Sequence, residues 1–266
     1  GSPIGGHFAI ATVSSANQLR PNVAALPGGG FLVSWESDQD GSTWNIYQQR
    51  FDAAFNKVGG PVTVNTTIPY NQNYSQTTVL ADGGWVVDWW SNGQDGSGWG
   101  VYQQRFNASG TKVGGEERVN TTTTADQNWS STAALKDGGW VVTWSSNGQD
   151  GSGWGVYQQR FNASGTKVGG EERVNATTLN QQDYNSVTPL KDGGWVVSWQ
   201  STAQDGSGEG VYGRVYNADG TTRAAEMRLS SIVAGDQFLP AVTALTDGGF
   251  VAVWGSGSWS SPTSFG

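Results

Sequence analysis

Gly139-Trp140-Val141-Val142-Thr143-Trp144 is the best preserved of five copies of one pattern in this chain of 266 residues. The other copies begin at Gly30, Gly84, Gly194 and Gly249. Their final tryptophans are spaced 54 or 55 residues apart, which indicates a repeat architecture. Two sets of side chains alternate with a period of two, and the β-branched and aromatic residues favour a strand. The chain is therefore expected to be built from five copies of one β-rich unit, with the recurring tryptophan in the core.

Each copy surrounds this strand with turn residues at the same distances. In the third copy a short strand precedes Asp137-Gly138-Gly139, the loop 146–153 follows the quoted stretch, and strands at 154–161 and 171–175 complete the unit. Asp-Gly and Gly-Gly dipeptides between alternating segments are typical of hairpins. Four antiparallel strands in each repeat predict one blade of a β-propeller.

The expected fold class is all-β: a five-bladed β-propeller of four-stranded antiparallel blades, in one domain over residues 1–266. The expected repeat units are 14–67, 68–122, 123–177, 178–232 and 233–266, the last completed by residues 7–13. An apolar residue stands eight positions before each recurring Gln, and counting back from Gln18 gives Ile10. The segment around Ile10 is thus expected to pair with the C-terminal blade and close the ring, which would remove exposed edges. An open arc that needs a second chain is the alternative.

Composition excludes several function classes. A net charge of −8 disfavours nucleic acid and anionic membranes as partners, and no apolar run approaches the ~20 residues of a membrane span. The sequence has no cysteine, which excludes disulfides and thiolate metal sites. Its one histidine, His7, precedes the repeats, which disfavours Ser-His-Asp and histidine–zinc chemistry. We expect a monomer that is not an enzyme, binds no nucleic acid and does not insert into membranes.

One face of the propeller is expected to carry the second-to-third loops and the links between blades, and loops on a rigid scaffold are where binding usually occurs. Aromatic rings suit the C–H faces of sugars, while amides and carboxylates suit their hydroxyls. The candidate ligand contacts on this face are Trp44, Trp99, Trp154, Tyr74, Trp129, Tyr184, Gln72, Gln127, Gln182, Trp90 and Glu209. The rings could instead be lids on the core, and the glutamines could bond to a neighbouring blade.

The same face repeats a Gln-Asp-Gly-Ser loop that could hold calcium. The candidate ligands are Asp38, Asp40, Asp95, Asp150 and Asp205. The loop lacks the alternating oxygen ligands of a calcium-binding loop. No cofactor is therefore expected, and the aspartates are expected to accept local backbone N–H bonds.

Glycoside cleavage requires only a pair of carboxylates, so it is the enzymatic alternative. Acids that are not copied from blade to blade include Glu36, Asp88 and Glu209, and a glycosidase would use Asp88 with Glu209. These two fall at different strand levels of separate blades. The sequence therefore favours binding over catalysis.

Residues 137–165, from Asp-Gly-Gly-Trp-Val-Val-Thr-Trp through Gln-Asp-Gly-Ser-Gly-Trp to Asn-Ala-Ser-Gly, resemble repeats of large secreted bacterial proteins, RTX-type or cadherin-containing adhesins. The resemblance covers nearly the whole chain and implies secretion and surface attachment. In architecture the chain is also similar to tachylectin-type five-bladed lectins, which bind sugar between blades. A secreted or cell-surface, lectin-like protein that binds a glycan or cell-surface polysaccharide is the expectation. Because residues 91–120 and 146–175 are identical, a structural or protein-interaction repeat, duplicated or engineered and without a ligand, is the alternative.

Overall fold

The computed structural model describes residues 6–11, 15–41 and 43–258, and all regular structure in these residues is β-strand. In chain order the strands are β1 (Gln18–Ala25), β2 (Phe31–Ser37), β3 (Asn45–Phe51), β4 (Lys57–Thr63), β5 (Gln72–Val79), β6 (Trp85–Asn92), β7 (Trp99–Phe106), β8 (Lys112–Arg118), β9 (Gln127–Ala134), β10 (Trp140–Asn147), β11 (Trp154–Phe161), β12 (Lys167–Arg173), β13 (Gln182–Pro189), β14 (Trp195–Thr202), β15 (Glu209–Tyr216), β16 (Thr222–Arg228), β17 (Asp236–Ala244) and β18 (Phe250–Gly257).

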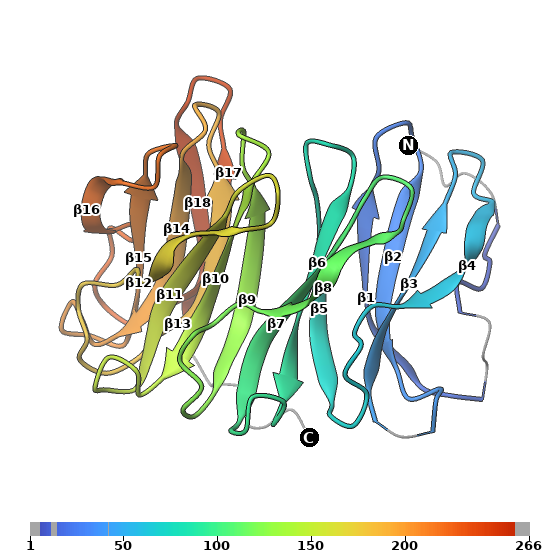
Figure 1. Ribbon diagram of the computed structural model, residues 1–266. Helices are drawn as coiled ribbons and strands as arrows, with labels where there is room; N and C mark the ends of the chain where they lie inside the picture. Colours follow the sequence, from blue (N-terminus) through green and yellow to red (C-terminus); the bar gives the residue numbers. More distant parts are fainter. Residues whose placement is uncertain (1–5, 12–14, 42, 259–266) are drawn as a thin grey trace.

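These strands form four antiparallel sheets of four consecutive strands and a last sheet of two, β17 and β18. We call the sheets blades 1 to 5 in chain order. The first strands of successive blades contact one another, and Figure 1 shows the early blades in blue and the last ones in orange at opposite ends of the molecule. The prediction of an all-β fold of four-stranded antiparallel blades is confirmed for blades 1 to 4.

The stretch 140–144 lies in β10, and its alternate side chains pack toward two different neighbouring blades. Trp140, Val142 and Trp144 pack in a cluster with residues of blade 2, whereas Val141 belongs to the cluster shared with Trp199 of blade 4. The recurring tryptophans of blades 1 to 4 are at most 3% exposed. Burying one indole removes ~150–250 Å² from water, which stabilises the fold by about 4–6 kcal/mol as an upper bound. The predicted core role of this strand is confirmed.

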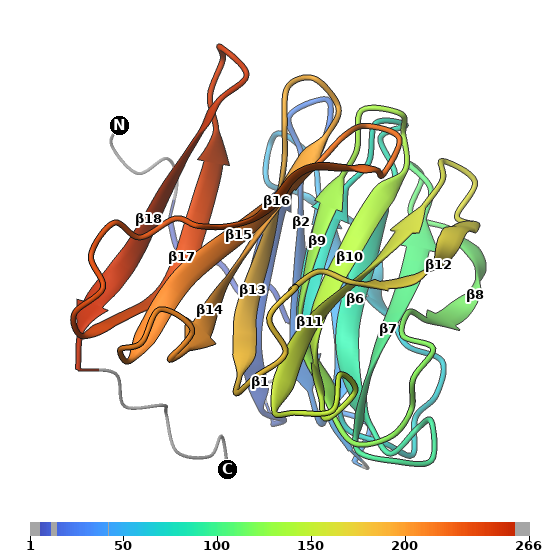
Figure 2. The ribbon, with the colours of Figure 1, turned by 90° about the vertical axis from the view of Figure 1, so that its left-hand side faces the viewer.

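The fifth blade differs from the prediction. Its two strands pack against blade 4 and form the hairpin at one end of the molecule in Figure 2. The third strand expected near the C-terminus falls mainly on residues 259–266, outside the described residues. Val251 and Val253 of β18 are 44% and 59% exposed, because in the described part of the chain no further sheet covers them.

The N-terminal segment also takes a different place. Its described residues, 6–11, form no strand, and the end of the expected strand (residues 12 and 13) lies outside the described residues. The Phe8 ring lies 5.5 Å from that of Phe51, and Ile10 packs on the cluster that contains Trp35. The segment thus covers the face of blade 1 that a preceding blade would bury. The predicted closure is wrong here: among the described residues no hydrogen-bonded pairing joins the sheets into a ring.

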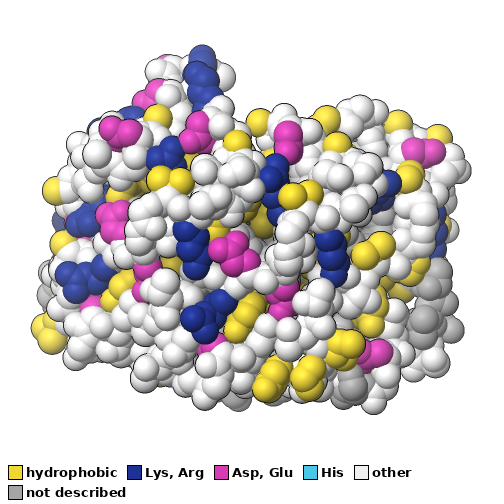
Figure 3. All heavy atoms as spheres, viewed as in Figure 1, with side chains coloured by type: hydrophobic (Ala, Val, Ile, Leu, Met, Phe, Trp, Pro, Cys, Tyr) yellow, Lys and Arg dark blue, Asp and Glu magenta, His cyan; other side chains and the backbone are white. Residues whose placement is uncertain are grey.

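The surface in Figure 3 carries basic and acidic side chains interspersed, without a continuous patch of either sign. Within the described residues, no helix long and apolar enough to cross a membrane is found.

Candidate functional site

A backbone bulge recurs in the first strand of every blade. The pairing of each first strand with the second shifts register at this point, for example between Asn73 and Gln76. The five residues at the bulges have positive φ angles, although none is glycine: Arg20 (46°), Tyr74 (58°), Trp129 (50°), Tyr184 (49°) and Leu239 (52°). This conformation costs a residue with a side chain roughly 1–2 kcal/mol. Bulges turn side chains away from the regular pleat and are frequent beside active sites.

The five bulge side chains line one common cavity. Its volume is about 530 Å³, and its walls also include Trp90, Ser130 and Asn185. A volume of this size fits the range typical of ligand sites. The cavity is therefore built from the same strained position of all five blades, and it differs from blade to blade only in the side chains.

A second cavity of about 390 Å³ shares four wall residues with the first: Arg20, Tyr74, Trp90 and Trp129. Its other walls come from the loop face that the sequence singled out. They are Leu19, Trp44, Asn71, Asn73, Trp99 and Asn128. We call the two cavities together the central site.

Aromatic rings form an unbroken series at the central site, and all of them except Trp154 line one of its two cavities. Tyr74 stacks on Trp90 with ring centroids 4.1 Å apart, and Trp90 meets Trp129 edge to face at 6.4 Å. Trp129 in turn lies 4.7 Å from Tyr184 and 4.8 Å from Trp154. All of these rings except Trp90, which is 8% exposed, are half-buried. The structure thus brings together most of the aromatic candidates that the sequence indicated.

Blade 1 contributes to the wall an ion pair between the partly exposed Arg20 and the buried Glu36. Arg20 donates to Glu36 at 2.8 Å and to the Tyr74 hydroxyl at 3.1 Å, with its guanidinium 4.2 Å from the Tyr74 ring centre. Glu36 is fully buried and also accepts the Tyr74 backbone N–H at 2.6 Å. Burial raises the pKa of Glu36, which these hydrogen bonds and the charge of Arg20 oppose. Glu36 therefore braces the bulge of the next blade.

Asp88 lies beneath the central site. It is fully buried and accepts hydrogen bonds from Ser130 at 2.6 Å and Thr132 at 2.9 Å, both on blade 3. Burial raises the pKa of Asp88 to about 6, and the two hydroxyl bonds oppose that rise. Ser130 also accepts the Trp90 indole N–H at 3.0 Å. Asp88 thus holds the wall of the cavity and does not line it.

A carboxylate pair stands on blade 4, and the sequence had indicated only one of its members. Asp183 of β13 pairs with Gln200, and Glu209 of β15 pairs with Thr202, so both point to one face of the sheet. Burial, with a further contribution from the charge of Glu209, raises the pKa of Asp183 to about 8, although a hydrogen bond with Gln200 opposes the rise.

Glu209 is less buried than its partner. Burial and then the charge of Asp236 raise its pKa, while a hydrogen bond from Thr202 at 2.8 Å lowers it. Its Oε2 atom is buried and has no hydrogen-bond partner among the described residues. A carboxylate oxygen in this state is free to take a proton.

Neither Asp183 nor Glu209 is among the wall residues of the two cavities, but the repeat relates both of them to residues that are. Asn73 and Asn128 stand where blade 4 has Asp183, and Trp44 and Trp99 stand where it has Glu209. All four equivalents line the second cavity. Both acids depart from the repeat, and the departure of Asp183 from Asn73 and Asn128 was visible in the sequence. It is the signal that sequence reasoning missed. The pairing of Asp88 with Glu209 considered above is wrong, because Asp88 is enclosed between blades 2 and 3.

The three candidate glutamines lie elsewhere than expected. Gln72, Gln127 and Gln182 are fully buried and line neither cavity. Gln72, for example, accepts the indole N–H of Trp89 at 2.7 Å and donates to the Tyr70 carbonyl at 3.1 Å. The recurring glutamine thus fixes the link between blades, because buried amides need partners of this kind.

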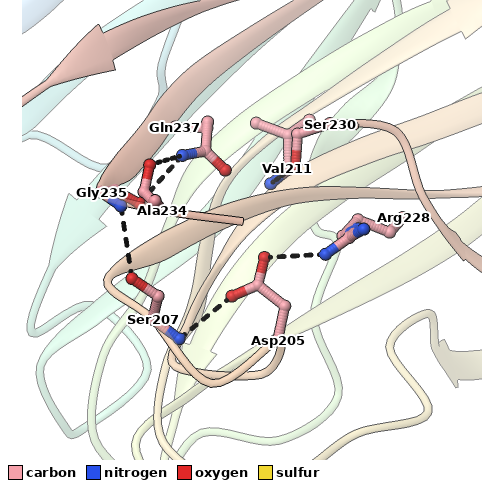
Figure 4. A network of polar contacts seen from close by, with 8 residues as sticks. All are labelled: Asp205, Ser207, Val211, Arg228, Ser230, Ala234, Gly235 and Gln237. Carbon is pink, nitrogen blue, oxygen red and sulfur yellow. Dashed lines mark hydrogen bonds and ion pairs between the residues drawn. The ribbon is translucent and has the colours of Figure 1, made fainter. Parts of the chain in front are cut away.

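The candidate calcium ligands accept hydrogen bonds within the protein. Asp205 accepts from Arg228 and from the Ser207 backbone, both at 3.3 Å (Figure 4). Asp150 and Asp95 each accept a backbone N–H two residues on, Asp40 accepts the Asn45 amide at 2.7 Å, and Asp38 accepts from Asn17. In the part of the chain that the structure describes, no three acidic or histidine side chains gather in a metal-binding arrangement.

Comparison with known proteins identifies relatives of the fold alone. No family model matches the chain, and no curated relative matches it in sequence. Among solved structures, the chain is similar to a Penicillium chrysogenum α-L-arabinanase complexed with arabinobiose: TM-score 0.60, 17% identity, 89% of this chain and 74% of that one covered. A Fusarium graminearum α-L-arabinofuranosidase complexed with arabinobiose gives TM-score 0.56, 15% identity and coverage of 89% and 74%. A Lactobacillus brevis α-L-arabinofuranosidase gives 0.50, 9%, 92% and 85%.

These similarities correct three expectations from the sequence. Three structures that share the fold are an α-L-arabinanase and two α-L-arabinofuranosidases, and the resemblance to RTX-type or cadherin-containing adhesins and to tachylectin-type lectins is not supported. The same finding corrects the expectation of a non-enzymatic, lectin-like propeller, because these three structures are enzymes. The misleading signal was the repetition itself, since it marks a scaffold and not an activity.

Proposed function

We propose that the protein is a glycoside hydrolase whose central site cleaves a polysaccharide, with Asp183 and Glu209 as the reacting carboxylates. One observation carries the proposal: the two acids that break the repeat stand on one face of one blade and interact electrostatically. The similarity to propellers that degrade arabinan supports it, and so does a site walled by aromatic rings.

The two carboxylates fit complementary roles in hydrolysis. With its pKa raised to about 8, Asp183 is protonated at neutral pH and can give that proton to the glycosidic oxygen as the bond to the anomeric carbon breaks. Water supplies a hydroxyl to that carbon, and Glu209 accepts the proton that water loses. Glycoside hydrolases use two carboxylates whose environments separate their pKa values in this way.

Arabinan is the first substrate to test, because two of the similar propellers hold arabinobiose. A glycan partner was expected from the sequence, and a polymer of this kind accords with the expected location outside the cell, which stays a prediction.

The test measures reducing-sugar release from arabinan, xylan and β-glucan by the wild type, Asp183→Asn and Glu209→Gln. Asn is the residue that blades 2 and 3 carry at this position, so Asp183→Asn should fold normally. Each substitution is expected to lower kcat/KM by roughly 10²–10⁴-fold, the usual contribution of a general acid or base. Asp205→Asn, which alters a loop carboxylate of the same blade, is the control and should keep full activity. Wild-type activity that survives both substitutions would contradict the proposal.

A further inference from the structure

The aromatic rings of the central site lie on one side of the carboxylate pair. We call Trp99, Tyr74, Trp90, Trp129, Trp154 and Tyr184 the aromatic track. We infer that the track binds several consecutive sugar units, so that the substrate is a chain held on the side of blades 2 and 3 and cleaved at blade 4. This inference rests on the proposed function, because that function supplies the point of cleavage.

The track is continuous across three blades. Trp99 meets Trp90 edge to face at 6.5 Å, and the contacts from Tyr74 through Trp90 and Trp129 to Tyr184 are the ones given above. Each step between ring centres is comparable to the length of one sugar unit. Tyr74 lies between Arg20 and Trp90, so the rings open to the cavities are those of Trp99, Trp129 and Tyr184, on three successive blades. A single sugar could cover one of these three rings, whereas only a chain could cover all of them.

At the start of the third strand, the series of tryptophans ends at blade 3. Blade 3 has Trp154 at the start of its third strand, and blade 4 has Glu209 there. Beyond blade 4, the positions equivalent to Tyr74 and Trp90 are Leu239 and Gly255, and the one ring near them is Phe238, at the position equivalent to Asp183. The binding surface therefore has more rings on the side of blades 2 and 3 than on the side of blade 5, and the units bound strongly belong to one product.

The rings are fixed before a ligand arrives. Positive-φ bulges set the directions of Tyr74, Trp129 and Tyr184, while the Ser130 hydroxyl holds the Trp90 indole. The Asn185 amide donates to the Trp129 carbonyl at 2.9 Å and so ties two neighbouring bulges together. Pre-organised rings bind without losing side-chain entropy, and stacking contacts add along a chain.

The experiment measures binding apart from hydrolysis. In Asp183→Asn, calorimetric titration with arabino-oligosaccharides of one to six units, and with xylo- and cello-oligosaccharides in parallel, gives the affinity at each length. For one series the affinity is expected to rise at least tenfold between one and four units and then to level off. Trp99→Ala, which removes a half-buried ring from the wall of the second cavity, should in this background lower the affinity for four units about tenfold and that for one unit less than twofold.

Two further variants separate ring contact from general damage. Trp99→Phe keeps a ring and should recover most of the affinity, while Tyr70→Ala, which removes an exposed aromatic outside both cavities, should change nothing. Equal affinity at all lengths, or no binding of any series, overturns the inference. If hydrolysis depends on Asp183 and Glu209 but affinity ignores length, the track is wrong and the proposed function stands. If length governs binding but both acids can be removed without loss of hydrolysis, the proposed function fails instead.

Discussion

Blades 3 and 4 have the same four strands, the same bulge and the same buried tryptophans, yet they face the central site with different chemistry. Blade 3 presents Asn128 and Trp154, whereas blade 4 presents Asp183 and Glu209 at the same two positions. The backbone is constant because the repeated residues lie in the core and the turns. The comparison teaches that the repeat determines the scaffold, and that the departures from it determine the candidate chemistry.

Converting blade 4 into a copy of blade 3 at these two positions is expected to have the largest effect. The double variant Asp183→Asn/Glu209→Trp should lower hydrolysis of the best substrate by at least 10³-fold, because both proton-transfer groups are gone. Its melting temperature should stay within a few degrees of the wild type, since blade 3 already accommodates this pair. A collapse of the fold in calorimetry would show that the two blades differ in more than their site residues.

The second prediction concerns what the two blades share. Trp144→Ala in blade 3 and Trp199→Ala in blade 4 should each lower the free energy of unfolding by about 3–5 kcal/mol, because both indoles are fully buried. Trp154→Ala should cost clearly less, since its ring is half-exposed. Urea denaturation measures all three, and a large difference between the first two would mean that the repeated core is not equivalent.

The third prediction uses pH to distinguish Asp183 from Asn128. Folded Asp183 keeps its proton up to about pH 8, whereas the unfolded chain releases it near the ordinary value of 3.8. The folded state therefore binds more protons across this window, and the free energy of unfolding should fall as pH rises through it. Asp183→Asn should flatten the slope between pH 6 and 8. A residual slope at lower pH is expected in both proteins, because Asp88, whose pKa is raised to about 6, titrates in the same direction.

The smallest effects are expected on the loop face. Asp150→Asn and Asp205→Asn should each change stability by less than about 1 kcal/mol, because the aspartates accept hydrogen bonds in half-exposed loops. A chelator is expected to leave the melting temperature unchanged in both variants and in the wild type. A calcium-dependent rise in melting temperature that Asp150→Asn abolishes would instead assign a metal to blade 3.

The scaffold could be predicted from sequence because its causes are local and repeated. The alternation from Trp140 to Trp144 gave the strand, the Asp-Gly-Gly turns gave the hairpins, and the period gave the blades. The ends could not be predicted in this way. The spacing of Ile10 predicts a closing strand, but in the structure this residue packs on the apolar cluster of blade 1. A sequence pattern does not show which of two apolar surfaces a segment will cover.

The site was predicted only in part. The aromatic candidates do converge, because a repeated position on successive blades faces the same cavities. The positive-φ bulges were not foreseen, since nothing in the residues Tyr74 or Trp129 signals a left-handed backbone. Asp183 was overlooked because an Asp in place of Asn is a common change in a polar segment between strands. Only the structure shows that it shares one face of the sheet with Glu209, on the other side of β14, and so forms a carboxylate pair.

The bulges also bear on how such a protein can change its specificity. The strain of a positive φ arises from the backbone and the Cβ atom, so it is similar for Arg, Tyr, Trp or Leu. The backbone cost of the five positions that face one cavity is therefore the same whichever side chain they carry, and only the contacts of each side chain, such as the ion pair of Arg20 with Glu36, differ. In a scaffold of this kind the side chains at the bulges can change to suit a new ligand while the buried tryptophans stay as they are.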